Sequence, residues 1–375
     1  MRKVVTLRTG RLEVEVIRAD MPLDELCGFA SRNNAKRGYL FVSKVLGKHY
    51  PVRPSKMQKV YLALARKLAD QGLNPPVVAI ALAETATGLG QGVFEALLSL
   101  EKINQRLFIH TTRYRLNRKT AFLFEEPHCH AAEHILYTPI GVDEREVFLG
   151  ARTLLLLDDE MSTGKTLSNL AAAFQSINPR LERIVLVAIK NWLDDDTREA
   201  IEEKTSCQVE FVSLLDGYFS FVPNLEFLIT TGHKSVGNGA PKDSILRSNF
   251  GRLGLKDSPS LDYNEIMQKL QLSRDGTTLV LGTGEFSYLP YKLAAALEND
   301  GYDVVFQSAT RSPIILDGDI VHKLEFEDNY FDEIDNFLYN VRPEQYDHVV
   351  ACYETQTVPE GHDLPRQLGA QMVFF

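Results

Sequence analysis

The feature that most constrains the fold of this chain is a run of four leucines, Leu154–Leu157, followed directly by Asp158 and Asp159. A short apolar run of this kind is typical of a strand that is buried on both faces of a parallel sheet. The turn Ser162-Thr-Gly-Lys-Thr166 and an Ala/Leu-rich segment with helical spacing come next. We therefore expect a strand–turn–helix unit with its polar residues at the carboxyl end of the strand, where α/β sheets bind ligands.

The turn predicts an anion site. A helix start leaves backbone N–H groups unpaired and carries the positive end of the helix dipole, which favours a phosphate group. Gly164 lets the backbone approach that ligand closely. Asp158 and Asp159 do not suit a phosphate, but they suit the vicinal hydroxyls of a sugar and a Mg²⁺ ion shared with those hydroxyls. The pattern predicts a site for a sugar phosphate such as ribose 5-phosphate. The turn would add hydroxyl donors and one charge from Ser162, Thr163, Lys165 and Thr166.

Two other interpretations of the turn remain open at this point. Gly164-Lys165-Thr166 matches the end of a Walker-type nucleotide loop, which would indicate a P-loop ATPase. That motif needs a glycine five positions before Gly164, where this chain has Asp159. The second alternative is a turn with a purely structural role.

Length and charge set broad limits on the class of protein. The chain has 375 residues, which favours two or three domains. Its formal net charge is −9 and it shows no basic bias, so we expect no nucleic-acid partner. Four cysteines lie far apart, the N-terminus lacks the apolar run of a signal peptide, and no apolar stretch approaches the roughly 20 residues of a membrane span. We expect a cytoplasmic protein with no membrane partner.

The order of apolar segments predicts the domain organisation. Short apolar runs alternate with helix-length segments between Val77 and Leu214, as in βαβ units around a buried parallel sheet. A second unit of this kind begins at Thr277, after a Gly/Ser/Asn/Pro-rich stretch and a short expected helix. We therefore predict a first domain over residues 1–262, a linker helix within 263–276 and a smaller α/β domain over 277–375.

The two units share a weak sequence pattern. Val77–Leu97 followed by Thr111-Thr112-Arg113 is similar to Thr277–Leu297 followed by Ala309-Thr310-Arg311. Each has a strand, a turn with a glutamate, an Ala/Leu-rich helix, a second strand and then Thr-Arg. Similarities this short arise more often by chance than by duplication, and a different strand order in the two units would exclude duplication.

The segment that begins at Leu154 resembles the binding motif for 5-phosphoribosyl-1-pyrophosphate (PRPP) in type I phosphoribosyltransferases. The resemblance lies in the apolar strand, the two acids and the small-residue loop with Thr-Gly-x-Thr. It implies an α/β fold with a parallel sheet flanked by helices. It also implies that Asp158 and Asp159 contact the ribose hydroxyls and hold Mg²⁺, and that Ser162–Thr166 hold the 5-phosphate. Glu160 departs from the family pattern, and Ser162 stands where purine-type members often carry an aspartate, which argues against purine salvage.

The resemblance implies two further loops. Ala83, Glu84, Thr85 and Ala86 follow an expected strand and stand where the family has its pyrophosphate loop. The basic stretch from His110 to Lys119 stands where the family has a mobile loop that closes over PRPP. Arg113 would offset the charge of the departing pyrophosphate, or the stretch is only a solvated hairpin. The other members of this expected loop are Tyr114, Arg115, Arg118 and Lys119.

The acceptor pocket is expected from position alone. The N-terminal region forms the acceptor-binding hood in type I enzymes, which implicates Lys44, Lys48 and His49 and would suit an anionic acceptor. His128 and His130 are two further candidates for this pocket. His130 and His134 also have metal-compatible spacing if their segment is helical, although no distant third ligand can be identified.

The resemblance extends over essentially the full chain. Lys44–Pro51, the Glu-Glu-Pro-His-Cys-His-Ala run and Ala309–Pro313 are similar to one phosphoribosyltransferase family. Its C-terminal domain is named TRSP for the Thr-Arg-Ser-Pro motif, and its members accompany bacterial tellurite-resistance and stress genes. In that domain a strand–turn–helix context suits phosphate or nucleotide contact, but Ser287 replaces the third glycine of a dinucleotide fingerprint. The candidate ligand residues there are Gly282, Gly284, Glu285 and Arg311.

These observations predict a phosphoribosyltransferase that uses PRPP and Mg²⁺ to transfer ribose 5-phosphate to a small-molecule acceptor, or runs the reverse reaction. The product would be a nucleotide-like metabolite. The alternative is a non-catalytic, PRPP- or nucleotide-sensing regulatory protein of the same fold. A homodimer is the family expectation.

Overall fold

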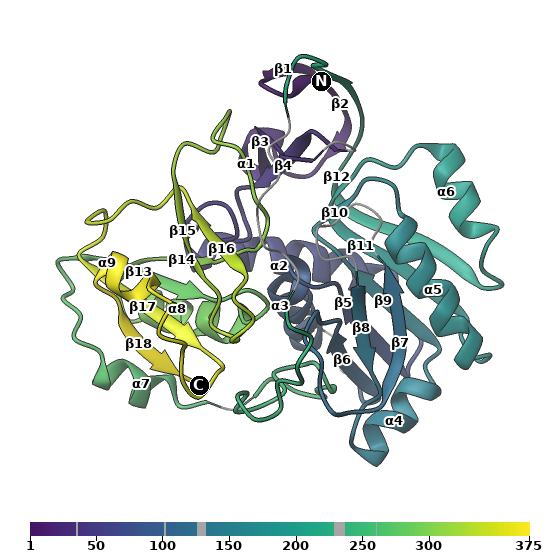
Figure 1. The fold of residues 1–375 in the computed structure, drawn as a ribbon. Helices are drawn as coiled ribbons and strands as arrows, with labels where there is room; N and C mark the ends of the chain where they lie inside the picture. Colours follow the sequence, from purple (N-terminus) through teal and green to yellow (C-terminus); the bar gives the residue numbers. More distant parts are fainter. Residues whose placement is uncertain (35–36, 101–102, 126–132, 229–236, 260) are drawn as a thin grey trace.

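The computed structural model of the protein describes residues 1–34, 37–100, 103–125, 133–228, 237–259 and 261–375. It is an α/β protein with one large sheet, a smaller C-terminal sheet and helices between and around them (Figure 1). The fold class expected from the sequence is therefore confirmed. Among the described residues, no helix combines the length and apolar character needed to cross a bilayer.

The larger sheet has the strand order β1-β2-β12-β11-β9-β5-β6, and the short β10 pairs with β11. The strands from β12 to β6 run parallel, whereas β2 pairs antiparallel with β12 and with β1. The four leucines lie in β9, between β5 and β11, and all are buried, as their unbroken apolar run predicts. The strand bounds are β1 (Arg2–Leu7), β2 (Gly10–Ala19), β5 (Val77–Ala81), β6 (Arg106–His110), β9 (Thr153–Leu157), β10 (Glu160–Met161), β11 (Arg183–Asn191) and β12 (Gln208–Pro223).

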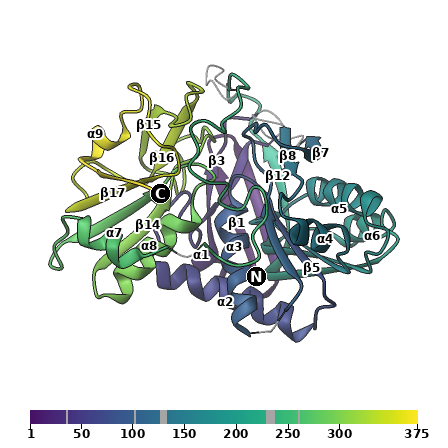
Figure 2. The same cartoon turned by 90° about the horizontal axis from the view of Figure 1, so that it is seen from below.

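Helices cover both faces of this sheet. On one face, α2 (Pro54–Asp70) and α3 (Ala86–Leu100) pack against each other and against α8 (Tyr288–Asn299) of the C-terminal part (Figure 2). On the other face lie α4 (Val142–Leu149), α5 (Lys165–Ile177) and α6 (Asp195–Glu202). Alternate residues of β5 enter the two hydrophobic clusters, Val77 and Ala79 on the α3 side and Val78 and Ile80 on the α5 side. The cluster on the α3 side continues into β13 and β14, so one core joins the two sheets.

The smaller sheet has the order β14-β13-β17-β18, and all its strands run parallel. This order matches β6-β5-β9-β11 of the larger sheet, strand for strand along the chain. In both units an antiparallel hairpin follows the second strand, β7–β8 in the first and β15–β16 in the second. The bounds are β7 (Thr120–Glu125), β8 (Glu133–Tyr137), α7 (Tyr263–Lys269), β13 (Thr277–Gly282), β14 (Asp303–Ser308), β15 (Lys323–Glu327), β16 (Asp335–Tyr339), β17 (His348–Tyr353), α9 (Leu364–Leu368) and β18 (Gln371–Phe374).

Individual backbone contacts follow the same correspondence. The N–H of Thr111 donates to the carbonyl of Ala81 at 2.9 Å, and the N–H of Ala309 donates to that of Gly282 at 3.0 Å. Two isolated bridges also match, because Thr112 pairs with Ile135 in β8 and Thr310 pairs with Phe337 in β16. The sequence similarity between the two stretches thus coincides with equal strand order and equal hydrogen bonding.

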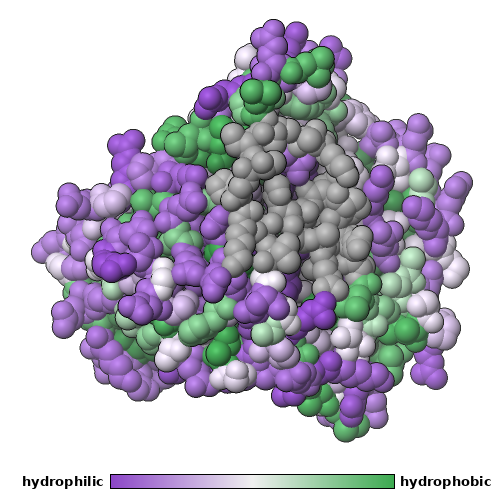
Figure 3. Space-filling model, in the orientation of Figure 1, coloured by the Kyte–Doolittle hydropathy of each residue, from purple (hydrophilic) through white to green (hydrophobic). Residues whose placement is uncertain are grey.

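An N-terminal hairpin and the segment after it lie against both units. The hairpin consists of α1 (Leu23–Leu26), β3 (Cys27–Ser31) and β4 (Tyr39–Ser43). The following segment reaches the C-terminal sheet, where Val52 and Phe306 exchange backbone hydrogen bonds of 2.9 and 2.8 Å. The domain limits expected at 263–276 stay a prediction; α7 lies within that stretch. On the face shown in Figure 3, hydrophilic residues predominate and hydrophobic side chains stand between them in small groups.

Candidate active site

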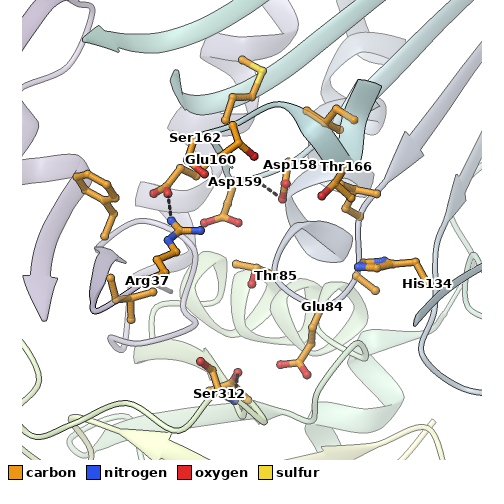
Figure 4. Close-up of a pocket in the computed structure, with 18 of the residues that line it drawn as sticks. Arg37, Glu84, Thr85, His134, Asp158, Asp159, Glu160, Ser162, Thr166 and Ser312 are labelled. Carbon is orange, nitrogen blue, oxygen red and sulfur yellow. Dashed lines mark hydrogen bonds and ion pairs between the residues drawn. The ribbon is translucent and has the colours of Figure 1, made fainter. Parts of the chain in front are cut away.

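A cavity of about 180 Å³ opens at the carboxyl ends of β5 and β9. Its lining comes from the loops after these strands, the N-terminal hairpin with the segment that follows it, Arg113 and His134, and the C-terminal segment from Thr310 to Ser312. Ser162, Asp158 and Asp159 lie on one side of it, with Glu84, Thr85 and Ser312 across from them (Figure 4). The structure therefore brings the predicted diol, phosphate and pyrophosphate residues to one cavity.

The two aspartates lie at the end of β9, as their place in the sequence predicts. The N–H of Asp158 still pairs with the Val187 carbonyl at 3.0 Å, and its Oδ1 accepts a hydrogen bond of 2.9 Å from the N–H of Asp159. Burial raises the pKa of Asp159, and the Glu160 carboxylate adds to this effect, against the opposing charge of Lys190. A carboxylate whose charged form is disfavoured in this way gains from a cation or hydroxyl donors supplied by a ligand.

The turn after the aspartates opens onto the cavity with the geometry of a helix N-terminus. Gly164 is the N-cap of α5 and has φ +63°, the left-handed conformation that favours glycine. A Cβ atom at this position would lie 2.6 Å from Ile201 Cδ1, so the site also excludes a side chain. All five residues of the turn line the cavity: Ser162, Thr163, Gly164, Lys165 and Thr166. Their role in holding a phosphate stays a prediction.

The loop after β5 carries a buried glutamate between two cations. Glu84 Oε1 lies 2.6 Å from Lys48 Nζ, and Glu84 Oε2 lies 3.8 Å from Arg311 Nε. Burial disfavours the charged form, but Lys48 and Arg311 outweigh it and lower the pKa of Glu84. Ala83 and Thr85 also line the cavity, whereas Ala86 is buried as the first residue of α3.

Of the expected mobile loop, Arg113 lines the cavity, where its Nη2 lies 3.2 Å from His134 Nε2. Tyr114 instead stacks on Tyr330 of the C-terminal unit, with 4.0 Å between ring centroids. Arg118 pairs with Asp243 at 3.5 Å in an exposed position. The cavity lining contains none of Tyr114, Arg115, Arg118 and Lys119.

The expected acceptor residues separate into two groups. Lys44 pairs with Asp319 at 2.9 Å, and Lys48 donates to the carbonyls of Gly284 and Ala309 at 2.9 and 2.7 Å. These lysines hold the N-terminal segment to the C-terminal unit and do not line the cavity. His49 does line it. His128 and His130 lie outside the described residues, and no group of three or more potential metal ligands occurs among the described ones.

His49 is a neutral imidazole at the cavity wall. Burial, together with the charge of Lys48, lowers its pKa to about 3. Its Nδ1 atom is buried and has no hydrogen-bond partner among the described residues. Buried polar atoms are nearly always paired, so a bound ligand is a natural source of this partner.

The sequence interpretation missed several residues on the hairpin side of the cavity. Arg32, Arg37 and Phe41 line it, and the side chain of Glu160 forms ion pairs with Arg37 and, at 3.3 Å, with Lys190. The basic composition of this stretch was visible in the sequence. Which of its side chains face the cavity depends on the β3–β4 hairpin, for which no clear turn signal was available.

The candidate ligand residues of the C-terminal unit also separate. Glu285 accepts hydrogen bonds from Thr112 Oγ1 at 2.6 Å and from the N–H of Arg113 at 2.7 Å, and it pairs with the buried Arg252 at 3.1 Å. Glu285 therefore joins the two units instead of lining the main cavity. Gly282 and Gly284 precede it in the same turn, and the Gly284 carbonyl accepts from Lys48. Arg311 is the member of this set that lines the main cavity.

Several solved structures show a distant similarity to part of this chain. None of the curated proteins matches the chain. Among solved structures, adenine phosphoribosyltransferase from Thermoanaerobacter pseudethanolicus is 14% identical, covering 51% of this chain and 96% of its own, with a TM-score of 0.34. Hypoxanthine phosphoribosyltransferase from Staphylococcus aureus is 13% identical, covering 45% and 79%, with a TM-score of 0.26. The Trypanosoma cruzi enzyme in complex with its product IMP is 16% identical, covering 48% and 83%, with a TM-score of 0.27.

Two family models account for most of the chain. The model described as "TRSP domain C terminus to PRTase_2" matches residues 249–368. The model described as "Phosphoribosyl transferase" matches residues 26–218, more than half of the chain and the whole stretch from the hairpin to β12 that carries the aspartates and the glycine turn. The chain therefore belongs to the phosphoribosyl transferase family, in the form that carries a C-terminal TRSP domain.

Proposed function

We propose that this protein transfers the ribose 5-phosphate group of PRPP to a small-molecule acceptor. The observation that carries the proposal is the shared cavity, where Asp158 and Asp159 stand beside the open N-terminus of α5. Ribose 5-phosphate offers the matching pair of groups, a vicinal diol and a phosphate. In the reaction the bond from C1 to pyrophosphate breaks, its electron pair leaves with pyrophosphate, and the acceptor's deprotonated nucleophile bonds to C1 from the opposite face.

The residues present fit a Mg²⁺ ion that is shared with the substrate. Two adjacent carboxylates suit this hard cation, which takes its remaining oxygen ligands from water, hydroxyls and phosphates. Asp158 and Asp159 would hold it, and when bound it supplies positive charge to the leaving group. The protein itself then contributes mainly orientation, water exclusion and fixed charge, through the phosphate turn and Arg113.

The acceptor would enter on the hairpin side of the cavity. Arg32, Arg37 and Phe41 form this wall together with the neutral imidazole of His49. Glu160 pairs with Arg37 and Arg32 adds a second cation to this wall, so the pocket suits an acceptor that offers hydrogen-bond acceptor atoms to these guanidinium groups. Ser162 is not a base near neutral pH, so an acceptor whose nucleophile is already deprotonated fits best.

Titration calorimetry with PRPP and Mg²⁺ tests the proposal. The double variant Asp158→Asn/Asp159→Asn should lose at least about 100-fold in PRPP affinity, because two charged contacts disappear. Asp195→Asn/Asp196→Asn makes the same charge change on two exposed neighbours in α6 and should bind like the wild type. Equal PRPP affinity in all three proteins, or no PRPP binding by the wild type, would refute the proposal. Binding without pyrophosphate release for a panel of acceptors would favour a sensing role.

A further inference from the structure

Three residues of the C-terminal unit lie in the wall of the cavity, although they belong to the smaller sheet. Thr310, Arg311 and Ser312 follow β14 directly and line the cavity together with the loops after β5 and β9. Ser312 lies across the cavity from the aspartates, on the same side as Glu84 (Figure 4). The phosphoribosyl transferase unit therefore does not enclose its own cavity without the second unit.

The geometry of Arg311 suits the binding of a ligand anion. Its side chain is only 11% exposed, and its guanidinium lies 4.7 Å from the centre of the Tyr114 ring, which holds it in place. Among the described residues, the carboxylate that pairs with it is Glu84, whose Oε2 is 3.8 Å from Arg311 Nε, beyond hydrogen-bonding distance. Glu84 therefore balances part of the charge of Arg311 without accepting a hydrogen bond from the Arg311 guanidinium. A planar guanidinium binds phosphate groups bidentately.

The arrangement of the strands indicates which anion would reach Arg311. Ala81 of β5 pairs with Leu157 of β9, so the Ala83–Thr85 loop faces the two aspartates. If the ribose hydroxyls contact the aspartates and the 5-phosphate contacts the turn before α5, the pyrophosphate at C1 is the remaining charged group of PRPP. On the hairpin side, Glu160 forms ion pairs with both Arg37 and Lys190, so a carboxylate already offsets part of the charge of these two cations. On the opposite wall, Arg113 and Arg311 stand near the single carboxylate of Glu84, which also pairs with the buried Lys48.

We propose that Arg311 of the C-terminal unit binds the pyrophosphate group of PRPP, so that the second unit completes the active site of the first. This inference rests on the proposed function, because it takes the other two groups of PRPP to be bound as described there. It gives the Thr-Arg-Ser segment a chemical role, as a pyrophosphate contact additional to Arg113 and the loop after β5.

The internal repeat supports this role independently. Ile80 pairs with Leu156 and Leu281 pairs with Ala351, so Glu354 of the second unit corresponds to Asp159 of the first. By the same register Glu285 corresponds to Glu84. In the second unit the guanidinium of Arg252 fills the space between these two acids, with two bonds of 2.6 Å to Glu354 and two bonds of 3.1 and 3.3 Å to Glu285. In the first unit the space between Glu84 and Asp159 belongs to the open cavity. The guanidinium of Arg311 lies in the wall of that cavity and does not fill it.

Calorimetry on the full-length protein with two separate probes tests the inference. Ribose 5-phosphate reports on the aspartates and the phosphate turn, and inorganic pyrophosphate with Mg²⁺ reports on the Arg311 side. Arg311→Gln should weaken pyrophosphate binding at least about tenfold, the scale of a lost charge-assisted contact, and change ribose 5-phosphate binding less than about twofold. Arg342→Gln removes an exposed arginine of the same unit and should leave both affinities unchanged.

The outcomes distinguish the two proposals. Pyrophosphate binding by Arg311→Gln with wild-type affinity, while ribose 5-phosphate still binds, overturns the role of Arg311 and leaves the proposed function intact. A wild type that binds neither ribose 5-phosphate nor PRPP overturns both. Thermal unfolding checks the fold of each variant, and if Arg311→Gln does not fold, Arg311→Lys keeps the charge but loses the bidentate geometry. Its pyrophosphate affinity should be intermediate, and wild-type affinity in that variant would also overturn the inference.

Discussion

The two halves of this molecule contain the same strand order and the same kind of strand-end loop, but they use it differently. In the first half, the space between Glu84 and Asp159 belongs to an open cavity. In the second half, Arg252 occupies the space between Glu285 and Glu354, and only about 10 Å³ remains there. The same backbone arrangement therefore borders an open cavity in the first half and forms an interface between the two halves in the second.

This difference shows what a ligand site requires beyond its fold. Both copies place acids at the ends of parallel strands, where burial disfavours their charge. In the second copy the protein supplies the compensating cation itself, and the guanidinium bonds that result fasten the two units together. In the first copy Lys48 and Arg311 compensate Glu84, whereas burial still raises the pKa of Asp159, which leaves a role for a metal ion and a sugar. A strand-end acid is thus evidence for a site only when the surrounding chain leaves it open.

Removal of the internal cation should give the largest effect on stability. Arg252→Met leaves Glu285 and Glu354 buried without their shared partner, so we expect a loss of about 3–5 kcal/mol in the free energy of unfolding. Urea denaturation measures it, with Arg366→Met, a change at an exposed arginine of the same unit, as the control. A loss under 1 kcal/mol would mean that Arg252 does not hold the second half closed.

Low pH should lower the stability of the folded protein through protonation of His49, which lies in the first half. Its pKa is about 3 in the folded protein and near 6.5 in the unfolded chain, so the unfolded state binds more protons between these values. The contribution of neutral His49 to the free energy of unfolding is fully present above pH 6.5. Below pH 6.5 this contribution falls by about 1.4 kcal/mol per pH unit. His49→Gln should remove that part of the slope between pH 6 and pH 4 and match the wild type at pH 8. Parallel stability curves for the two proteins would contradict the prediction.

A pair of glycine substitutions gives the smallest but most direct comparison. Gly164 and Gly284 both have left-handed φ angles, +63° and +56°, in turns that lead from a parallel strand to a helix. Alanine at either position should cost about 1–2 kcal/mol of stability from backbone strain. Only Gly164→Ala should also weaken ribose 5-phosphate binding. Gly164 lies in the turn that lines the cavity, and its added Cβ would clash with Ile201 of α6, so the turn must shift. A Cβ added at Gly284 would have no atom closer than 3.5 Å. Equal ligand affinity in both variants would show that the turn before α5 does not bind the phosphate.

Local patterns in the sequence predicted much of the fold. The four leucines lie in β9 as expected, and the alternation of strands and helices expected between Val77 and Leu214 is present from β5 to β12. These elements have strong apolar periodicity and sharp boundaries, so neighbouring residues are enough to define them. The hairpins β3–β4, β7–β8 and β15–β16 were not predicted. They are short, and their pairing partners stabilise them more than their own composition does.

The sequence predicted the part of the site that follows a single strand. It did not predict the part that forms where distant segments of the chain meet. Asp158 to Thr166 follow a single strand, so their proximity needs no knowledge of the fold. The sequence could not show that His49 lines the cavity while Lys48 does not. Both residues lie in an irregular segment whose path depends on the C-terminal unit. Arg311 was expected to serve a ligand site within its own domain. Only the packing of α2 and α3 on α8 shows that it reaches the cavity of the other unit.

The path of the segment around Lys48 has a consequence for biosynthesis. Lys48 bonds to Gly284 and Ala309, 236 and 261 residues further along the chain, and the carbonyl of His49 bonds to Asn340, 291 residues further along. At a translation rate of about 5–20 residues per second, these partners leave the ribosome roughly 15–60 s after the segment itself. The segment at Lys48 and His49 therefore lacks these contacts for most of the time that synthesis takes. A chain that ends before Asn340 also lacks the contact that holds His49 in the cavity wall.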